Sequence, residues 1–252
     1  MKIMSFNLLC YGPDEVTWYL RLPLVLRTIR NANPDSFGVQ EAHIMWMNAL
    51  KYALPDYDYV GVGRDDGKED GEFSAIFYKK DKFTVLDKGN FWLSETPEKP
   101  GKGWDAACIR ICSWAKLKCN KCGKEFVHLN THLDHKGPIA MQKGAELVAK
   151  RGIEIAGSSP AFFTGDFNVT PESLPCKAVK ECGFVDCRDI AKTADKGATF
   201  HAFKEDDPSY HTVIDYVFVK GDVKVNSFKV IRDHIDSQVP SDHYPVIAEV
   251  EI

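Results

Sequence analysis

Acidic, amide and imidazole side chains interrupt several apolar stretches that otherwise have the character of β-strands. The clearest case lies near the C-terminus, where Asp242 and His243 are adjacent just before the last expected strand. Comparable positions earlier in the chain are held by Asn7, His132, Asp166 and Asn168. Polar groups inside strands are costly unless they are satisfied. We therefore expect the ends of these strands to converge on one polar site.

The pair Asp166 and Asn168 has the residue types and the spacing for acid–base chemistry. Residues two apart in an extended segment face the same side, so a carboxylate and an amide project together. The carboxylate can orient a water molecule and accept its proton, and the amide can hold a phosphate oxygen. An Asp/Asn turn explains the same two residues equally well, and the motif alone leaves both interpretations open.

Glu41 and Asn7 are candidate metal ligands. Glu41 follows a short buried strand, and Asn7 lies within the first strand. Their oxygens suit Mg²⁺ or Mn²⁺, hard ions that keep several waters and take only one or two carboxylates. Taken singly, each residue is better explained as a cap or a solvated charge.

Asp215 lies in an apolar run and should have a partner for its charge. His243 is a natural candidate, because a neighbouring carboxylate fixes the tautomer of an imidazole and raises its pKa. His132 also lies in an apolar run, where a lone histidine is usually a satisfied core residue. Arg110, inside an expected strand, suits phosphate through its planar fork of donors, or is an edge residue that extends to solvent.

The apolar periodicity predicts an α/β domain that spans residues 1–252. Helices are expected from Pro23 to just before Asn33, over 44–54, and over 138–156, where apolar residues recur every three or four positions. Strands are expected from Lys2, at 36–40, 57–62, 73–78, 83–92, 108–118 and 125–133, from 161, and at 213–220, 223–230 and 245–252. Many short strands with few helices favour two packed mixed sheets flanked by helices.

The composition restricts the classes of partner. The net charge of −4 gives no electrostatic basis for tight non-specific binding of nucleic acid. No stretch approaches the length of a membrane span, and the N-terminal residues become polar too soon for a signal peptide. We therefore expect a cytoplasmic protein that has no membrane partner and no obligate protein partner.

The eight cysteines are expected to be reduced thiols, because the chain is long and has no leader. Cys119 and Cys122, followed by Gly123, resemble half of a zinc ribbon. A structural zinc site needs four ligands, and the chain has no second pair with this spacing. A hairpin turn is the favoured interpretation, and zinc binding is the alternative.

Six short motifs, in this order along the chain, resemble the endonuclease/exonuclease/phosphatase superfamily, which includes the DNase I-like nucleases. They are Ser5-Phe6-Asn7, Gln40-Glu41, Asn130-Thr131-His132, Gly165-Asp166-Phe167-Asn168, Ile214-Asp215-Tyr216 and Ser241-Asp242-His243-Tyr244-Pro245. Each motif alone is weak, but the ordered set spans the chain. The resemblance implies a four-layer α/β sandwich of two packed mixed β-sheets flanked by helices. It also implies Mg²⁺-dependent hydrolysis of phosphate esters, with Mn²⁺ as an alternative ion.

The same resemblance implies roles for the metal ligands and the groups that handle water. The implied ligands are Glu41, as the principal one, with Asn7 and Asp242. Asp166 is expected to position and deprotonate the attacking water, and Asn168 to hold that water or a phosphate oxygen. Many relatives have a second metal-binding polar residue where this chain has Leu9, so the resemblance leaves the number of metal ions open.

The remaining implied roles concern the phosphate. His243, oriented by Asp215, is expected to bind the scissile phosphate and to stabilise its developing charge. Arg110 matches an arginine that contacts phosphate. His132 has a carboxylate partner in the nuclease branch, and Glu72 matches that partner's position.

Segments 91–97 and 103–106 resemble bacterial members near the deadenylase and nocturnin branch. This resemblance favours a phosphodiesterase, nuclease or phosphatase that acts on a phosphorylated substrate such as a nucleotide or an RNA 3′ end. The alternative is a non-catalytic phosphate- or nucleotide-binding module on the same fold. The complete set of acid, amide and imidazole residues favours the enzyme.

Overall fold

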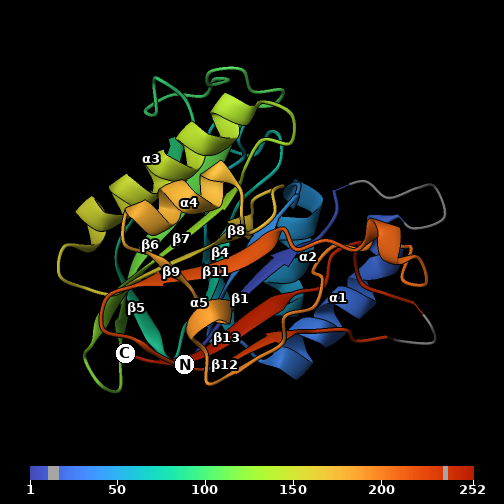
Figure 1. Cartoon of the computed structure of the whole chain (residues 1–252). Coiled ribbons are helices and arrows are strands. Elements are labelled where there is room, and N and C mark those ends of the chain that lie inside the picture. Colours follow the sequence, from blue (N-terminus) through green and yellow to red (C-terminus); the bar gives the residue numbers. More distant parts are fainter. Residues whose placement is uncertain (11–16, 235–237) are drawn as a thin grey trace.

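Two mixed β-sheets pack face to face in the computed structural model, which describes residues 1–10, 17–234 and 238–252 (Figure 1). The seven-stranded sheet has the order β10 (Thr193–Ala194), β12 (Lys224–Val230), β13 (Val246–Glu251), β1 (Lys2–Asn7), β2 (Ser36–Gln40), β4 (Ile76–Lys79) and β3 (Tyr57–Val60). The six-stranded sheet has the order β5 (Phe83–Trp92), β6 (Ile111–Cys119), β7 (Glu125–His132), β8 (Ala161–Asp166), β11 (Asp215–Lys220) and β9 (Val185–Asp186). Each sheet contains parallel and antiparallel pairs, which confirms the predicted α/β sandwich.

Helices cover the outer face of each sheet (Figure 1). The helices on the seven-stranded sheet are α1 (Trp18–Ala32) and α2 (Ile44–Ala53), and those on the six-stranded sheet are α3 (Pro138–Ala156) and α4 (Leu174–Glu181). The shorter elements are α5 (Cys187–Ile190) and the 3₁₀ turn Pro208–Tyr210. Trp46 of α2 packs with Phe6 and Val39, while Val148 of α3 packs with Leu129. Burial of apolar side chains therefore holds all four layers together.

Two sequence-based boundaries were wrong. The first helix begins at Trp18, and Pro23 lies inside it. A proline removes only one helical donor, and the turn before it is anchored by Arg21, which is 1% exposed and donates to the backbone oxygens of Leu8 and Pro240. Arg110 directly precedes β6 and is not inside a strand. Helices α4 and α5 and strands β9 and β10 were not predicted from the sequence.

The hairpin turn predicted at Cys119 and Cys122 is confirmed. It joins β6 to β7, and Gly123 has a φ of 73°, in the left-handed region that favours glycine. The free thiols include Cys108, Cys112, Cys119, Cys122, Cys176, Cys182 and Cys187. Among the described residues, no helix combines the length and the apolar character that a membrane crossing requires.

A polar contact joins the two sheets through Asn130 of β7, which is fully buried. Its Oδ1 accepts hydrogen bonds from Gln40 Nε2 at 2.7 Å and from Thr164 Oγ1 at 2.9 Å. Its Nδ2 donates to the backbone oxygens of Val39 at 2.9 Å and Ala75 at 3.0 Å. Because both atoms of the amide are used twice, Asn130 fixes how the carboxyl end of β2 lies against β7.

We predict that Asn130→Ala lowers the free energy of unfolding by about 2–4 kcal/mol, because several buried polar groups lose a partner and a cavity forms. Chemical denaturation monitored by tryptophan fluorescence measures the change. Asn226→Ala is the control: its amide donates to Glu251 at the surface, and its effect should stay within about 0.5 kcal/mol. Equal stability of the two variants would contradict the assigned role of Asn130.

Candidate functional site

The site lies where the ends of strands from both sheets meet. In the seven-stranded sheet, parallel pairing places Asn7 beside Gln40. In the six-stranded sheet, Asp166 lies in one row between His132 on the parallel strand β7 and Asp215 on the antiparallel strand β11. Ligand sites of open α/β sheets lie outside the carboxyl ends of parallel strands, and this edge has that geometry.

Asn7 connects the two sheets at this edge. Its Nδ2 donates to Glu41 Oε1 at 2.9 Å and to Asp166 Oδ2 at 2.9 Å. The other carboxylate oxygen of Glu41 accepts the backbone N–H of Cys10 at 3.1 Å. Two carboxylates that are far apart in the sequence therefore share one amide group.

Two imidazoles flank the carboxylate of Asp166, which is 1% exposed. Its Oδ2 lies 3.5 Å from His132 Nε2 and 3.7 Å from His243 Nε2. His243 Nδ1 lies 3.0 Å from Asp215 Oδ2, so the partnership expected for Asp215 is present. The sequence-predicted acid, imidazole and second acid thus form one buried row.

Asn168 completes this row. Its backbone N–H donates to Asp166 Oδ1 at 2.8 Å, and its Nδ2 lies 2.9 Å from His132 Nε2. Both Asn168 and Glu41 have left-handed backbone, with φ of 55° and 57°. Asparagine tolerates this region, whereas a glutamate there is uncommon, and such strain clusters at functional sites.

The charges in this row are strongly coupled. Burial disfavours the imidazolium of His243, but the carboxylates of Asp215 and Asp166 outweigh burial and raise the pKa of His243 well above its ordinary value. Burial also raises the pKa of Asp166 to about 7, opposed by His243 and reinforced by the charge of Asp215. Asp166 is therefore poised to exchange a proton near neutral pH.

His132 differs from His243. Burial and the positive charge of Arg110 lower the pKa of His132 well below its ordinary value, so its ring is neutral. Glu72 Oε2 lies 4.0 Å from His132 Nδ1, beyond hydrogen-bond distance, and forms its close ion pair with Arg64. The structure therefore brings Glu72 to the site, but its direct partner is an arginine that the sequence analysis missed. Arg64 lies in a loop, where no apolar periodicity indicates which side chains are buried, so its role could not be predicted from the sequence.

Arg110 is 5% exposed and does not extend to solvent. Its guanidinium lies 4.0 Å from Glu72, 3.9 Å from Asp134 and 3.2 Å from His135 Nδ1. Its Nε and Nη1 have no hydrogen-bond partner among the described residues. Unused donors on a buried cation next to the Asp166 row suit an anionic ligand.

Three groups of potential metal ligands occur among the described residues, with ligand atoms within 4.8 Å of one another in each group. They are Glu41 with His132 and Asp166; Asp166 with Asp215 and His243; and Cys108 with Asp134 and His135. The carboxylate of Asp134 already accepts four backbone N–H groups. Asp242, the other expected ligand, is partly buried, and both burial and the charge of Glu41 raise its pKa.

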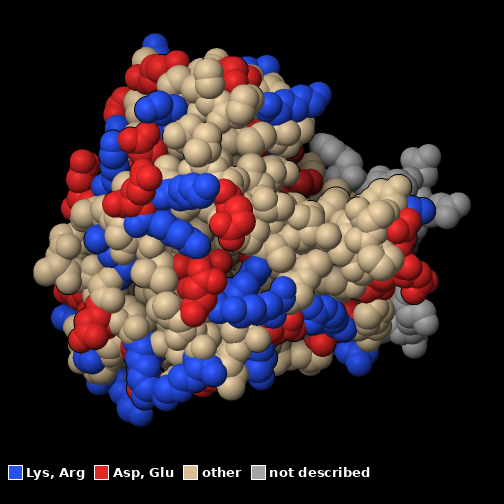
Figure 2. Space-filling view, viewed as in Figure 1, with Lys and Arg blue, Asp and Glu red and all other residues tan. Residues whose placement is uncertain are grey.

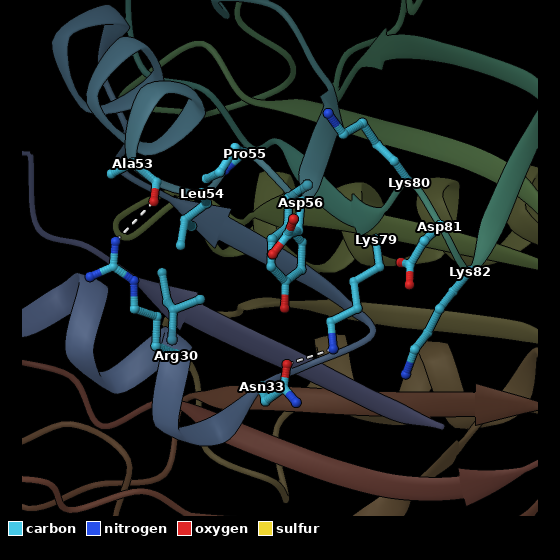
Figure 3. Close-up of a pocket in the computed structure, with 12 residues that line it drawn as sticks. Arg30, Asn33, Ala53, Leu54, Pro55, Asp56, Lys79, Lys80, Asp81 and Lys82 are labelled. Carbon is cyan, nitrogen blue, oxygen red and sulfur yellow. Dashed lines mark hydrogen bonds between the residues drawn. The ribbon is translucent and has the colours of Figure 1, made fainter.

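Two hollows of the surface differ in their relation to this site. One, of about 500 Å³, includes Glu72, Arg64 and Cys10 in its walls and therefore adjoins the Asp166 row. The other, of about 620 Å³, lies at the opposite edge of the seven-stranded sheet, where Asn33 precedes β2 (Figure 3). In Figure 3, Lys79 reaches Asn33 and none of the labelled residues belongs to the Asp166 row.

The family model of the endonuclease/exonuclease/phosphatase family matches residues 4–243. The chain belongs to this family. The match confirms the resemblance inferred from the six motifs, and members of the family are hydrolases that include nucleases and phosphatases.

Solved structures of family members agree with this assignment. A mannosyl-6-phosphatase of Bacteroides thetaiotaomicron is 38% identical, with a TM-score of 0.93 and full coverage of both chains. A family member of Bacteroides vulgatus is 36% identical, with a TM-score of 0.94, over 100% of this chain and 98% of that one.

Nocturnin of Drosophila melanogaster is 24% identical in an alignment of 288 positions that covers 95% of this chain. The match covers 43% of Nocturnin, so the chain spans less than half the length of that relative. The catalytic domain of human Nocturnin, at 17% identity and a TM-score of 0.79, shares the fold.

We predict that Asp215→Asn lowers the pKa values of both His243 and Asp166. The carboxylate of Asp215 stabilises the imidazolium of His243 and repels the carboxylate of Asp166. Without the negative charge of Asp215, His243 and Asp166 should therefore each lose a proton at lower pH. NMR titration of metal-free protein, labelled in the histidine rings and carboxyl groups, measures both. His234, whose pKa is raised mainly by Glu205 at the surface, is the internal control. An unchanged His243 titration would refute the coupling.

Proposed function

We propose that this chain is a Mg²⁺-dependent hydrolase of phosphate esters that works by attack of water on phosphorus. The observation that carries the proposal is the position of Asp166, which lies 2.9 Å from an amide that also holds Glu41 and is flanked by two imidazoles. The row combines a buried base, hydrogen-bond donors for phosphate and candidate ligands for a cation. Phosphoryl transfer requires chiefly these elements.

The residues at this edge fit a hard divalent cation. Glu41 would be the principal ligand, together with Asp242, because Mg²⁺ takes few carboxylates and oxygen donors suit it. Asn7 would join them after a turn of its amide, because its Nδ2 here faces both carboxylates and its Oδ1 accepts the backbone N–H of Leu9. Burial and mutual repulsion already disfavour the negative charges here, and a cation would relieve both penalties. When bound, the ion would polarise the phosphoryl oxygens and stabilise the leaving oxygen.

Asp166 supplies the base in this proposal. Its Oδ2 would accept the proton of the attacking water, since the bound cation would offset the effect of burial and keep this carboxylate ionised at neutral pH. The backbone N–H of Asn168 fixes Oδ1 of the same carboxylate. The Asn168 side chain, which lies beside His132, would hold the water or a phosphate oxygen.

His243 supplies positive charge opposite the base. Asp215 orients the ring through Nδ1, which directs Nε2 toward the Asp166 row. As an imidazolium it would donate a hydrogen bond to a non-bridging phosphate oxygen, where charge accumulates in the transition state. Arg110, with unused donors, and the neutral ring of His132, near Glu72, would complete the phosphate contacts.

For the substrate, we propose a small phosphorylated molecule bearing hydroxyl groups. The full-length similarity to a mannosyl-6-phosphatase supports this class. So does the hollow beside the Asp166 row, whose walls include Asp65, Glu69 and Asp70. Carboxylates accept hydrogen bonds from hydroxyl groups and repel a polyanion. On the face shown in Figure 2, acidic and basic side chains are interspersed, as suits a substrate of low charge.

A nucleotide or an RNA 3′ end is the second candidate substrate. The similarity to Nocturnin over 95% of this chain favours it. Both candidates require the same attack on phosphorus, and they differ in what fills the neighbouring hollow.

We predict that Asp166→Ala and His243→Ala each lower turnover at least ~100-fold, since each removes a positioned catalytic group.

We predict that Glu41→Gln instead raises the Mg²⁺ concentration needed for half-maximal rate, because it removes the principal charged ligand. Steady-state rates across a Mg²⁺ titration measure both effects, and circular dichroism checks the fold. Asp87→Asn, on the exposed face of β5, is the control. Near-normal turnover of the Asp166 variant would exclude it as the base.

We predict that purified protein with Mg²⁺ releases phosphate from mannose 6-phosphate and related sugar phosphates faster than it cleaves an RNA 3′ tail. The panel should include inositol phosphates, nucleotides and bis-p-nitrophenyl phosphate, each with Mg²⁺ and with chelator. Faster cleavage of RNA or nucleotides would favour the second candidate. Binding of these compounds without any turnover would leave only the non-catalytic phosphate-binding module.

A further inference from the structure

The tip of the β6–β7 hairpin carries a second group of metal-ligating side chains, at the opposite end of β7 from His132. Cys119 ends β6, and Cys122 follows it in the turn. The backbone N–H of Cys122 donates to Cys119 Sγ at 3.3 Å, and that of Gly123 donates to the backbone oxygen of Cys119 at 2.8 Å. The turn thus folds the two thiols toward the same point.

This turn stabilises a thiolate. The thiol of Cys122 and backbone N–H groups of the turn hydrogen bond the sulfur of Cys119 and lower its pKa. Burial has the opposite effect on the thiols elsewhere, raising the pKa of Cys112, Cys176, Cys182 and Cys187. Since the thiolate is the form that binds metals, the hairpin pair is prepared for a soft cation.

The hairpin tip is also fixed in place. The backbone N–H of Asn120 donates to Lys82 O at 2.8 Å, its Nδ2 donates to Asp81 O at 3.0 Å, and its Oδ1 accepts from Thr84 Oγ1 at 2.7 Å. Lys82 is close enough to Cys119 that the charge of Cys119 contributes to raising the pKa of Lys82. The positive charges of Lys82 and of Lys121 in the turn would offset the negative charge of several thiolates around Zn²⁺.

One chain offers too few ligands for a structural zinc ion. Zn²⁺ in such sites is tetrahedral and takes four ligands, and no group of three or more potential ligands among the described residues includes Cys119 or Cys122. Residues 120–124 are exposed, so a second molecule can approach the tip. A hollow of about 410 Å³ beside the two cysteines has Met1, Phe83 and Ile252 in its walls, an apolar surface that a second tip can cover.

We propose that Cys119 and Cys122 from two copies of this chain bind one Zn²⁺, joining two hairpin tips in a symmetric dimer. Each copy contributes the same two sulfurs, so the contact is self-complementary and closes at two copies. Binding releases the thiol protons that remain. The site is separate from the phosphate-ester chemistry and does not depend on it.

The test begins with reduced, metal-free protein in a thiol-free phosphine reductant. Zn²⁺ should double the mass seen by light scattering after gel filtration, and chelator should reverse this. Co²⁺ should give the intense near-ultraviolet absorption of thiolate coordination, saturating at one ion per two chains. None of the candidate ligands in the Asp166 row contains sulfur, so that row does not produce this absorption.

Three variants separate the hairpin site from other metal binding. The double variant Cys119→Ser, Cys122→Ser should stay monomeric with Zn²⁺ and lose the thiolate absorption. Cys108→Ser, which removes the thiol of another group of potential ligands, and Glu41→Gln, in the Asp166 row, should both dimerise with Zn²⁺ and show the thiolate absorption of the parent protein. A monomer that binds Co²⁺ through thiolates at one ion per chain would overturn the proposal. So would a zinc-induced dimer that persists in the double variant.

Discussion

One amide, that of Asn7, holds carboxylates from two sheets, and the rest of the site depends on this contact. Asn7 donates to Glu41 and to Asp166 at the same distance of 2.9 Å. Asp166 is buried away from water and needs hydrogen-bond donors from the protein, and the shared donor also holds Glu41 beside it. The packing of one sheet on the other therefore sets the distance between the candidate metal ligand and the candidate base.

That packing is itself specified by polar contacts. Asn130 joins β7 to the backbone of β2, one residue before Gln40 and two before Glu41. Gly38 of β2 makes room for it, since a Cβ at that position would lie 2.1 Å from Asn130 Oδ1. Two sheets that meet only through apolar side chains can shift relative to one another at little cost. A buried amide whose oxygen and nitrogen each make two hydrogen bonds is satisfied in only one relative position of the sheets. The polar interior thus gives the site its precision.

The sequence predicted what depends on local pattern and missed what depends on tertiary contact. Most strands and α3 followed from apolar periodicity, and the residues of the Asp166 row stood out as polar interruptions of it. Helix α1 was placed too late because Arg21, whose buried hydrogen bonds anchor the first turn, gives no local signal. Arg64, the ion-pair partner of Glu72, lies in a loop and was equally invisible. Which carboxylate an arginine meets is decided by the fold, not by sequence spacing.

The charges of the site argue for a bound cation on physical grounds. Glu41, Asp166, Asp215 and Asp242 bring four carboxyl groups to one edge. His243 neutralises part of this charge, and its raised pKa reflects the excess. The remaining excess appears as raised pKa values of Asp166 and Asp242. A divalent ion among these groups would lower both pKa values, keep the base ionised and attract a phosphate that the carboxylates alone would repel. The same cluster that is costly without a cation becomes a phosphate site with one.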